Sequence, residues 1–292
     1  MQDDTTALRR WYAEGLRLTT PIRRNPTIVD AFAAVPRERF LGPGPWQIMS
    51  DKRPDEPFTT PDDHPHWVYH DVLVAIDPAR GLNNGMPSFW AHNFDHLDLR
   101  RGARVMQVGA GTGYYTAVLA EIVGLNGHVV AVEHDGDLAA RARTNLAPWP
   151  QVDVVAGDGR RHDPGEVDAV VVFAGATHPS PFWIDRLADN GRLLMPLTGE
   201  NRLGFMLRVI RRGESFDADA ISGVGIFHCA GGRHAESAAR LQQALEAQGT
   251  PSVPWQRREI PIRALHRGAP TTDAIPTAWY HGPGFWLERK EP

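Results

Sequence analysis

A glycine-rich turn between an apolar run and an amphipathic segment is the feature that most constrains the fold of this 292-residue chain. The stretch RVMQVGAGTGYYT occupies residues 104–116, with glycines at positions 109, 111 and 113. Glycine lets the backbone turn sharply and come close to a ligand, and a following helix offers its unpaired N–H groups. A strand before the turn and a helix after it form the context that a nucleotide-binding loop requires. The turn therefore predicts a ligand-binding α/β fold.

The chain from about residue 100 to 227 alternates short apolar runs with amphipathic segments. Strands are expected at residues 105–108, 128–132, 152–155, 169–173 and 192–197, and helices at residues 114–123, 136–146 and 181–188. Such alternation, with β-branched strands, predicts a doubly wound, mostly parallel sheet with helices on both faces. Two further strands, at residues 203–210 and 218–227, have no helix between them. We expect them to form an antiparallel hairpin that closes one edge of the sheet.

The regions outside this core are less regular. Ile28, Phe32 and Val35 have helical spacing, in a helix that should end before Pro36, and residues 42–66 are rich in proline and aspartate. Such a segment predicts a long loop, which serves either as a binding segment or lid or as a linker. A helix is expected at residues 235–248 with Gly249 as its C-cap, and residues 250–292 show no clear periodicity. We therefore expect three parts, namely a helical and loop region on the substrate side (1–99), a core (100–230) and a C-terminal extension (231–292).

The composition excludes several classes of function. Lysine and arginine number 31 against 35 aspartates and glutamates, and this net charge of −4 gives no electrostatic reason to expect nucleic acid or an anionic membrane as partner. No apolar run reaches the roughly 18 residues of a transmembrane helix, and MQDDTTALRRWYAEGL lacks a secretory pattern. The single cysteine, Cys229, excludes an intrachain disulfide and a thiolate-rich zinc site. We expect a cytoplasmic globular protein, whose oligomeric state the sequence does not indicate.

The glycine spacing discriminates between nucleotide cofactors. A dinucleotide-binding turn has a third glycine where this chain has Tyr114, so the pattern is G-x-G-x-G. This pattern resembles the first motif of class I S-adenosylmethionine-dependent methyltransferases. Glu133 ends the next predicted strand, where a carboxylate can accept both ribose hydroxyls, and Asp158-Gly159 follow the third, where that family contacts the adenine amine. The resemblance implies an S-adenosylmethionine site formed by Gly109, Ala110, Gly111, Thr112, Gly113, Tyr114, Glu133, His134, Asp158 and Gly159.

The chain lacks the motifs of two kinds of methyltransferase, and their absence reduces the range of possible methyl acceptors. Enzymes that methylate base amines usually carry Asn/Asp-Pro-Pro-aromatic after the fourth strand, but residues 173–179 read FAGATHP. Methylation of cytosine C5 needs a nucleophilic cysteine. Cys229 lies instead in HCAG near the seventh strand, where we expect a buried structural thiol.

Several segments together resemble the protein-L-isoaspartate O-methyltransferases. They are AFAAVPRERF (31–40), Tyr69-His70-Asp71, GLNNGMPSFWA (81–91), VGAGTGYYTAVLAE (108–121), the Asp158-Gly159 pair and NGRLLMPL (190–197). The resemblance implies a class I methyltransferase fold and an enzyme that transfers a methyl group to a carboxylate, such as that of an aspartate or isoaspartate, in a peptide or protein. In that family a segment of the form GQTISxP helps to hold the substrate carboxylate through its Ser and Thr. Here Asn83, Asn84 and Gly85 occupy the last three of its four central positions, so we expect these residues to position a different acceptor.

A carboxylate acceptor is already anionic at neutral pH, so proximity and alignment can suffice for catalysis. A neutral hydroxyl or amine acceptor would need a base, for which His70, His92, His96 or His178 could serve. His178 follows the fourth core strand, at the end of the sheet where such folds bind ligands. His92 and His96 are spaced like two metal ligands on a helix, but the glutamate of the zinc-protease motif is missing, so we expect surface histidines and no metal. Two alternatives remain open: a methyltransferase acting on small molecules and a cofactor-binding relative without catalysis.

Overall fold

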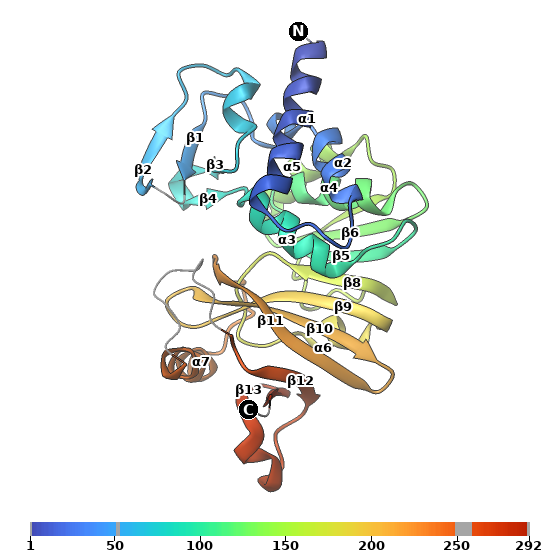
Figure 1. Ribbon diagram of the computed structural model, residues 1–292, viewed down its shortest axis with the longest axis vertical. Coiled ribbons are helices and arrows are strands. Elements are labelled where there is room, and N and C mark those ends of the chain that lie inside the picture. The colour runs from blue at the N-terminus through green and yellow to red at the C-terminus, as the bar shows by residue number, and fades with distance from the viewer. Residues whose placement is uncertain (1, 51–52, 249–258, 291–292) are drawn as a thin grey trace. The chain divides into compact units, whose positions relative to one another are not determined.

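The computed structural model describes residues 2–50, 53–248 and 259–290 (Figure 1). The chain divides into two compact units, which are described in turn. The first unit comprises residues 1–103 and 110–156, and the second comprises residues 104–109 and 157–292. The predicted glycine turn is where the chain passes from the second unit back into the first.

The helices of the first unit follow the predicted apolar periodicity. They are α1 (Gln2–Thr19), α2 (Thr27–Ala34), α3 (Pro87–Leu97), α4 (Tyr114–Val123) and α5 (Gly136–Leu146), with the short 3-10 helices η1 (Arg37–Phe40), η2 (Pro65–Val68) and η3 (Pro78–Arg80). Helix α2 buries Ile28 and Phe32 completely. It is followed by Val35 in the extended conformation that the next residue, Pro36, favours. The predicted helix and its end before Pro36 are confirmed.

A buried carboxylate on α3 fixes the turn between α1 and α2. The Asp95 side chain is 2% exposed. It accepts hydrogen bonds from the backbone N–H groups of Arg23 (3.1 Å), Arg24 (2.7 Å) and Asn25 (2.8 Å). A buried carboxylate needs donors, and the amides of an irregular turn need acceptors, so this contact satisfies both.

Residues 42–66 contain a β-hairpin where a long loop was expected. Strands β1 (Gln47–Ser50) and β2 (Arg53–Thr59) pair antiparallel in a four-stranded sheet that also contains β3 (Leu73–Asp77) and β4 (Leu82–Asn83). The strand order is β2-β1-β3-β4. The loop prediction was wrong because β2 is an edge strand, where a proline such as Pro57 is tolerated.

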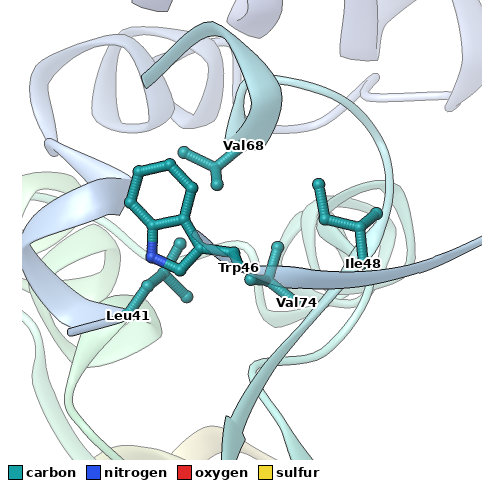
Figure 2. Packing of buried hydrophobic residues seen from close by; sticks show 5 residues of the cluster. All are labelled: Leu41, Trp46, Ile48, Val68 and Val74. Carbon is teal, nitrogen blue, oxygen red and sulfur yellow. The ribbon is translucent and has the colours of Figure 1, made fainter. Parts of the chain in front are cut away.

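A small apolar cluster stabilises this sheet. Leu41, Trp46, Ile48, Val68 and Val74 pack together, each no more than 9% exposed (Figure 2). The Trp46 indole N–H donates to the Gly42 carbonyl at 3.0 Å, so the ring is buried with its polar group satisfied. The cluster thereby joins two strands, β1 and β3, to the turns before and after them.

The first unit also contains two parallel strands, β6 (His128–Glu133) and β7 (Val152–Ala156). Their register pairs Val129 with Val152 and Glu133 with Ala156. Helix α5 follows β6, and its N-cap is Asp135, whose side chain accepts from the Asp137 and Leu138 backbone N–H groups. Both strands and the helices α4 and α5 were predicted and are confirmed.

The second unit contains a mixed sheet. Its described strands are β5 (Arg104–Val108), β8 (Val167–Val172), β9 (Leu187–Thr198), β10 (Leu203–Arg212), β11 (Ser215–Gly225), β12 (Ile262–Arg267), β13 (Ala278–Gly282) and β14 (Phe285–Arg289). They lie in the order β13-β14-β12-β11-β10-β9-β8-β5. Strands β5, β8 and β9 run parallel, and the pairs from β9 outward are antiparallel. The five predicted core strands are therefore found, three of them in this unit.

The predicted hairpin β10–β11 is antiparallel, but it does not close the sheet edge. Strand β12 pairs with β11 through Ala264 and Asp217, and β14 and β13 continue the sheet. The sequence did not predict these strands because they are only five or six residues long and alternate irregularly. Residues 250–258, 291 and 292, which belong to the same unassigned tail, lie outside the described residues.

The helices of the second unit are α6 (Pro181–Asp185), α7 (Ala235–Ala247) and the 3-10 helix η4 (Thr272–Thr277). The first is shorter than the predicted range 181–188 because β9 begins at Leu187, which pairs with Val167. Helix α7 was predicted and is confirmed, whereas its predicted C-cap, Gly249, lies outside the described residues.

Parallel strands alternating with helices, extended by antiparallel strands, are what the predicted α/β class requires. The two compact units do not follow the expected boundaries at residues 99 and 230, so the three-part division stays a prediction. Within the described ranges, none of the helices combines the length and the apolar character needed to cross a lipid bilayer.

We expect Asp95→Asn to lower the free energy of unfolding by about 1.5–3 kcal/mol, the range for hydrogen bonds to a charged group. The amide that replaces one carboxylate oxygen cannot accept from the turn amides. Urea denaturation followed by circular dichroism measures this difference. The control is Asp63→Asn, an exposed position in the same unit, which should change stability by less than about 0.5 kcal/mol. Equal stability of the two variants would show that the Asp95 contacts contribute nothing.

Candidate cofactor and acceptor site

The glycine turn adopts the conformation that its sequence predicts. Gly109, Gly111 and Gly113 have φ angles of 84°, 57° and 98°, a region that other residues rarely adopt. A Cβ at Gly113 would lie 2.8 Å from a Leu146 side-chain carbon, so this glycine is also required for packing against α5. Helix α4 begins directly after the turn, at Tyr114, so its free N–H groups lie beside the loop.

Glu133, at the end of β6, holds the glycine turn. It is 7% exposed. One carboxylate oxygen accepts from the Gly111 N–H at 2.7 Å, and the other accepts from the Asp135 N–H at 3.0 Å. Each carboxylate oxygen can accept a second hydrogen bond, so the group keeps acceptor capacity for a ligand. The structure thus brings together two of the predicted cofactor residues, Glu133 and Gly111.

The other predicted cofactor residues in and near this loop differ in how far they are buried. Ala110 and Thr112 are buried, and the Thr112 carbonyl accepts from Asn145 at 3.0 Å. The Tyr114 ring is 2% exposed and its hydroxyl lies 3.3 Å from that of Tyr12, so this side chain belongs to the core. His134, which follows Glu133, is exposed.

Asp158 and Gly159 lie in the second unit. The Asp158 carboxylate accepts from the Arg160 backbone N–H at 2.9 Å. A Cβ at Gly159 would lie 2.7 Å from a Val108 side-chain carbon, and the Gly159 carbonyl accepts from the Trp183 indole at 2.9 Å. These contacts hold the chain that follows β7 in a tight turn.

The residues of the first unit fit S-adenosylmethionine. A ribose needs an acceptor for its hydroxyls, and the buried Glu133 carboxylate is such a group. Gly111 has no side chain, and a Cβ there would lie 3.8 Å from its nearest neighbour, Ile76, so a ligand can approach the loop backbone closely at this position. We therefore regard Gly111, Gly113 and Glu133 as the residues that would hold this cofactor.

The two asparagines of the predicted acceptor segment have different environments. The Asn83 side-chain oxygen accepts from the Gly85 N–H at 2.9 Å, and the residue is part-exposed. Asn84 is 8% exposed, and its oxygen accepts from Arg37 at 2.7 Å. The Asn84 Nδ2 group is buried and has no hydrogen-bond partner among the described residues. Of the two residues, Asn83 is therefore the more exposed.

Arg37 is the residue of this region that sequence reasoning missed. Its side chain is completely buried. It donates to the carbonyls of Val68 (2.8 Å), His70 (2.9 Å) and Val72 (2.7 Å) and to the Asn84 side chain (2.7 Å). Because arginine has no acceptor atom, this contact also fixes the orientation of the Asn84 amide. The segment VPRERF contains Arg37, but its resemblance to a family motif does not by itself predict that this side chain is buried.

Gly85 connects the acceptor segment to the helix that follows the glycine turn. Its carbonyl accepts from the Tyr115 hydroxyl of α4 at 3.0 Å. Its φ angle is 79°, and a Cβ here would lie 2.7 Å from the Trp90 indole nitrogen. A glycine is thus required at this position, because the indole occupies the space of a side chain.

The remaining candidates have distinct environments. Cys229 is 8% exposed, and burial raises the pKa of its thiol to about 11, so the predicted buried thiol is confirmed. His178 lies between β8 and α6, with its Nδ1 atom 3.0 Å from the Thr177 hydroxyl. The rings of His92 and His96 lie 4.7 Å apart on α3. Across the part of the chain that the structure describes, no three His, Cys, Asp or Glu side chains form a metal-binding group.

Comparisons with known proteins give a consistent result. The sequence profile of the protein-L-isoaspartate(D-aspartate) O-methyltransferase family matches residues 17–225. The protein-L-isoaspartate O-methyltransferase of Ignicoccus hospitalis is 31% identical over 193 residues, which cover 65% of this chain and 82% of the relative.

Solved structures of the same class share the fold. A protein-L-isoaspartate O-methyltransferase superposes with a TM-score of 0.65 at 20% identity, covering 97% of this chain and 88% of the other. A putative protein-L-isoaspartate O-methyltransferase from Plasmodium falciparum, in complex with S-adenosyl-L-homocysteine, gives a TM-score of 0.60 at 19% identity, covering 76% and 97% respectively. These likenesses confirm the predicted class I methyltransferase fold. The chain therefore belongs to the protein-L-isoaspartate (D-aspartate) O-methyltransferase family of S-adenosylmethionine-dependent methyltransferases.

Proposed function

We propose that this chain transfers a methyl group from S-adenosylmethionine to a carboxylate of a peptide or protein, and that its acceptor is not a plain isoaspartyl residue. One observation carries the proposal. Within the first unit, Glu133 holds the glycine turn, and Tyr115, on the helix that this turn starts, donates to Gly85 of the acceptor segment. The cofactor loop and the acceptor segment are thus linked by a single helix.

The chain's own residues bind and orient the cofactor. Glu133 accepts from the ribose hydroxyls, and the backbone of Gly111 and Gly113 lies against the ligand. Bound there, S-adenosylmethionine supplies a methyl group on a positively charged sulfur. Within the first unit, His134 completes this proposed site, and Asp158 and Gly159 of the second unit stay predicted cofactor contacts.

Asn83 is the group that we assign to the acceptor carboxylate. Its oxygen is held by the Gly85 N–H, so its two Nδ2 hydrogens point away from that bond and can donate to an anion. A carboxylate is ionised at neutral pH and needs no proton removed, so orientation is the main requirement. Asn84 acts indirectly, because its side-chain oxygen accepts a hydrogen bond from Arg37.

The difference in acceptor follows from residues 82–85. The family segment GQTISxP provides hydroxyls, whereas this chain has Leu-Asn-Asn-Gly. The space beside Gly85 is filled by the Trp90 indole. A carboxylate that is normally fixed by hydroxyls would therefore find fewer donors here, which favours an acceptor of different shape.

We expect the methylated product to be labile in mild alkali, because methyl esters hydrolyse readily whereas methyl ethers and methylamines do not. Labelled S-adenosylmethionine with a panel of carboxylate-bearing peptides measures this as volatile methanol released by base. A plain isoaspartyl peptide should be a poor acceptor in the same assay. Label that resists alkali would favour a small-molecule or amine methyltransferase, and binding without turnover on any acceptor would favour a non-catalytic relative. Turnover of the isoaspartyl peptide at the rate of a standard repair enzyme would refute the altered acceptor.

We expect Glu133→Gln to weaken S-adenosylhomocysteine binding by about 1.5–3 kcal/mol, because a charged acceptor of two ribose hydrogen bonds is lost. Isothermal titration calorimetry measures the change. The control is Asp137→Asn, an exposed position in the first turn of α5, which should leave the affinity unchanged. Unchanged affinity in a folded Glu133→Gln variant would remove this residue from the site.

The two asparagines should respond differently to alanine substitution. Asn83→Ala should lower turnover by up to about 100-fold, the low end for losing a donor aimed at a reacting group, and should leave cofactor affinity unchanged. Asn84→Ala should lower the free energy of unfolding by about 1–3 kcal/mol, because the buried Arg37 loses an acceptor. Steady-state kinetics and urea denaturation of both variants provide the comparison. The opposite pattern would exchange the roles of the two residues.

A further inference from the structure

A pocket on the first unit is lined by residues that have no part in the proposed cofactor site or acceptor segment. Its volume is about 310 Å³, near the lower limit for pockets that hold small molecules. It is lined by η1, by the turn after η1 and by one face of α5, all of which belong to the first unit. The lining residues are Arg39, Gly42, Ala140, Arg141, Thr144 and Asn145.

Arg39 of η1 is held at this pocket by one of its five N–H donors. The residue is exposed, and its Nε–H group donates to the Asn145 backbone carbonyl at 2.8 Å. Arginine is a rigid planar fork without an acceptor atom, so this contact fixes the plane and leaves the two Nη groups available. Among the described residues, Arg39 has no further hydrogen-bond partner and no ion pair.

Arg141 of α5 is held at the same pocket from another element. Its Nη1 group donates to the Ile76 carbonyl of β3 at 3.3 Å. Its Nη2 group lies 3.6 Å from the place that a Cβ of Gly42 would occupy, so it faces a wall without a side chain. Gly42 has a φ angle of 77°, which favours glycine at this position. Within the described part of the chain, Arg141 has no carboxylate partner.

The pocket therefore holds two positive charges without a compensating negative charge. None of its six lining residues is an aspartate or a glutamate. Another exposed arginine of this unit, Arg80, is neutralised by Asp77 at 2.6 Å and by Asp135. Guanidinium forks match the oxygens of a phosphate group. A carboxylate would balance only one of the two charges, whereas a phosphate dianion balances both.

Asn145 adds a neutral donor to the same wall. It lies one helical turn after Arg141, so the two residues share a face of α5. One hydrogen of its Nδ2 group is donated to the Thr112 carbonyl at 3.0 Å. The amide nitrogen carries a second hydrogen, which can donate to a ligand oxygen.

We propose that Arg39 and Arg141, together with Asn145, form a binding site for a phosphate dianion, either the free ion or a phosphoryl group on a larger molecule. The two guanidinium groups bind the oxygens. The volume of the pocket leaves room for the molecule that carries the phosphoryl group. The site goes beyond the proposed methyl transfer, because none of its residues is assigned to the cofactor or to the acceptor.

Isothermal titration calorimetry of the full chain with inorganic phosphate, at constant ionic strength, tests the site. Arg39→Ala and Arg141→Ala should each weaken phosphate binding by about 10–100-fold, as for the loss of hydrogen bonds to a charged group. The matched control is Arg143→Ala. Arg143 is an exposed residue of the same helix that donates to the Val154 carbonyl at 3.2 Å, but it does not line the pocket.

The control variant removes the same charge and should leave phosphate binding unchanged. Equal weakening by all three substitutions would show that phosphate responds only to the net charge of the surface. That result, or the absence of saturable binding by the wild-type protein, would overturn the site.

Two peptides distinguish the source of the phosphate and the charge that the site selects. One carries phosphoserine, and the other has the same sequence with glutamate at that position. Tighter binding of the phosphoserine peptide than of inorganic phosphate would assign the group to a larger molecule, and the reverse would assign it to the free ion. Either result confirms the site if Arg39→Ala weakens it. Equal binding of the two peptides would refute selection of a dianion and overturn the proposal.

The cofactor is a competing occupant, because S-adenosylhomocysteine has a carboxylate and Asn145 contacts the glycine turn at Thr112. Phosphate should bind equally well with and without saturating S-adenosylhomocysteine. Arg39→Ala and Arg141→Ala should leave the affinity for S-adenosylhomocysteine unchanged. Loss of phosphate binding in its presence would assign the pocket to the cofactor and overturn the proposal. None of these measurements depends on whether the chain methylates a carboxylate.

Discussion

The buried guanidinium of Arg37 is the interaction on which the acceptor side of the first unit depends. A cation without exposure to water is stable only if its donors find acceptors, and Arg37 finds three carbonyls in residues 68–72 and one amide oxygen. The chain between η2 and β3 must therefore curve around this side chain. Asn84 completes the set, so its side chain is committed to the interior. Its neighbour Asn83 is part-exposed instead.

The sequence was sufficient to predict the elements whose pattern is set by burial. The strands β5 to β8 are runs of β-branched residues, and α4 and α5 follow glycine and aspartate signals that mark helix starts. The sequence did not predict the elements whose structure depends on which strands pair rather than on local composition. Strand β2 contains Pro57, which a strand tolerates at the edge of a sheet, and the sequence does not reveal that edge position. Strands β12 to β14 are too short to show an alternation of apolar and polar residues. Helix α6 ends early because β9 begins at Leu187, a register that no local pattern encodes.

The same distinction applies to the candidate site. Glu133 was predicted as a ribose acceptor from its place at a strand end, and its contact with Gly111 agrees with that placement. The choice between Asn83 and Asn84 could not be made from sequence, because it depends on Arg37, which lies 47 positions before Asn84 and contacts it only in the fold. The need for a glycine at position 85 could not be predicted either, because it comes from the tertiary packing of Trp90 against that residue. A motif thus indicates which positions matter, and packing decides which atoms are available.

The donor proposed for the acceptor carboxylate, the amide of Asn83, carries no formal charge. A carboxylate loses its negative charge as it accepts a methyl group, so a cationic partner would stabilise the substrate more than the transition state and would slow the transfer. In the proposed function, the uncharged amide of Asn83 would orient an anion with a smaller cost of this kind. Arg37, a cation in contact with the acceptor segment, directs its Nη donors to carbonyls and to Asn84. On this interpretation the chain contributes alignment to the reaction.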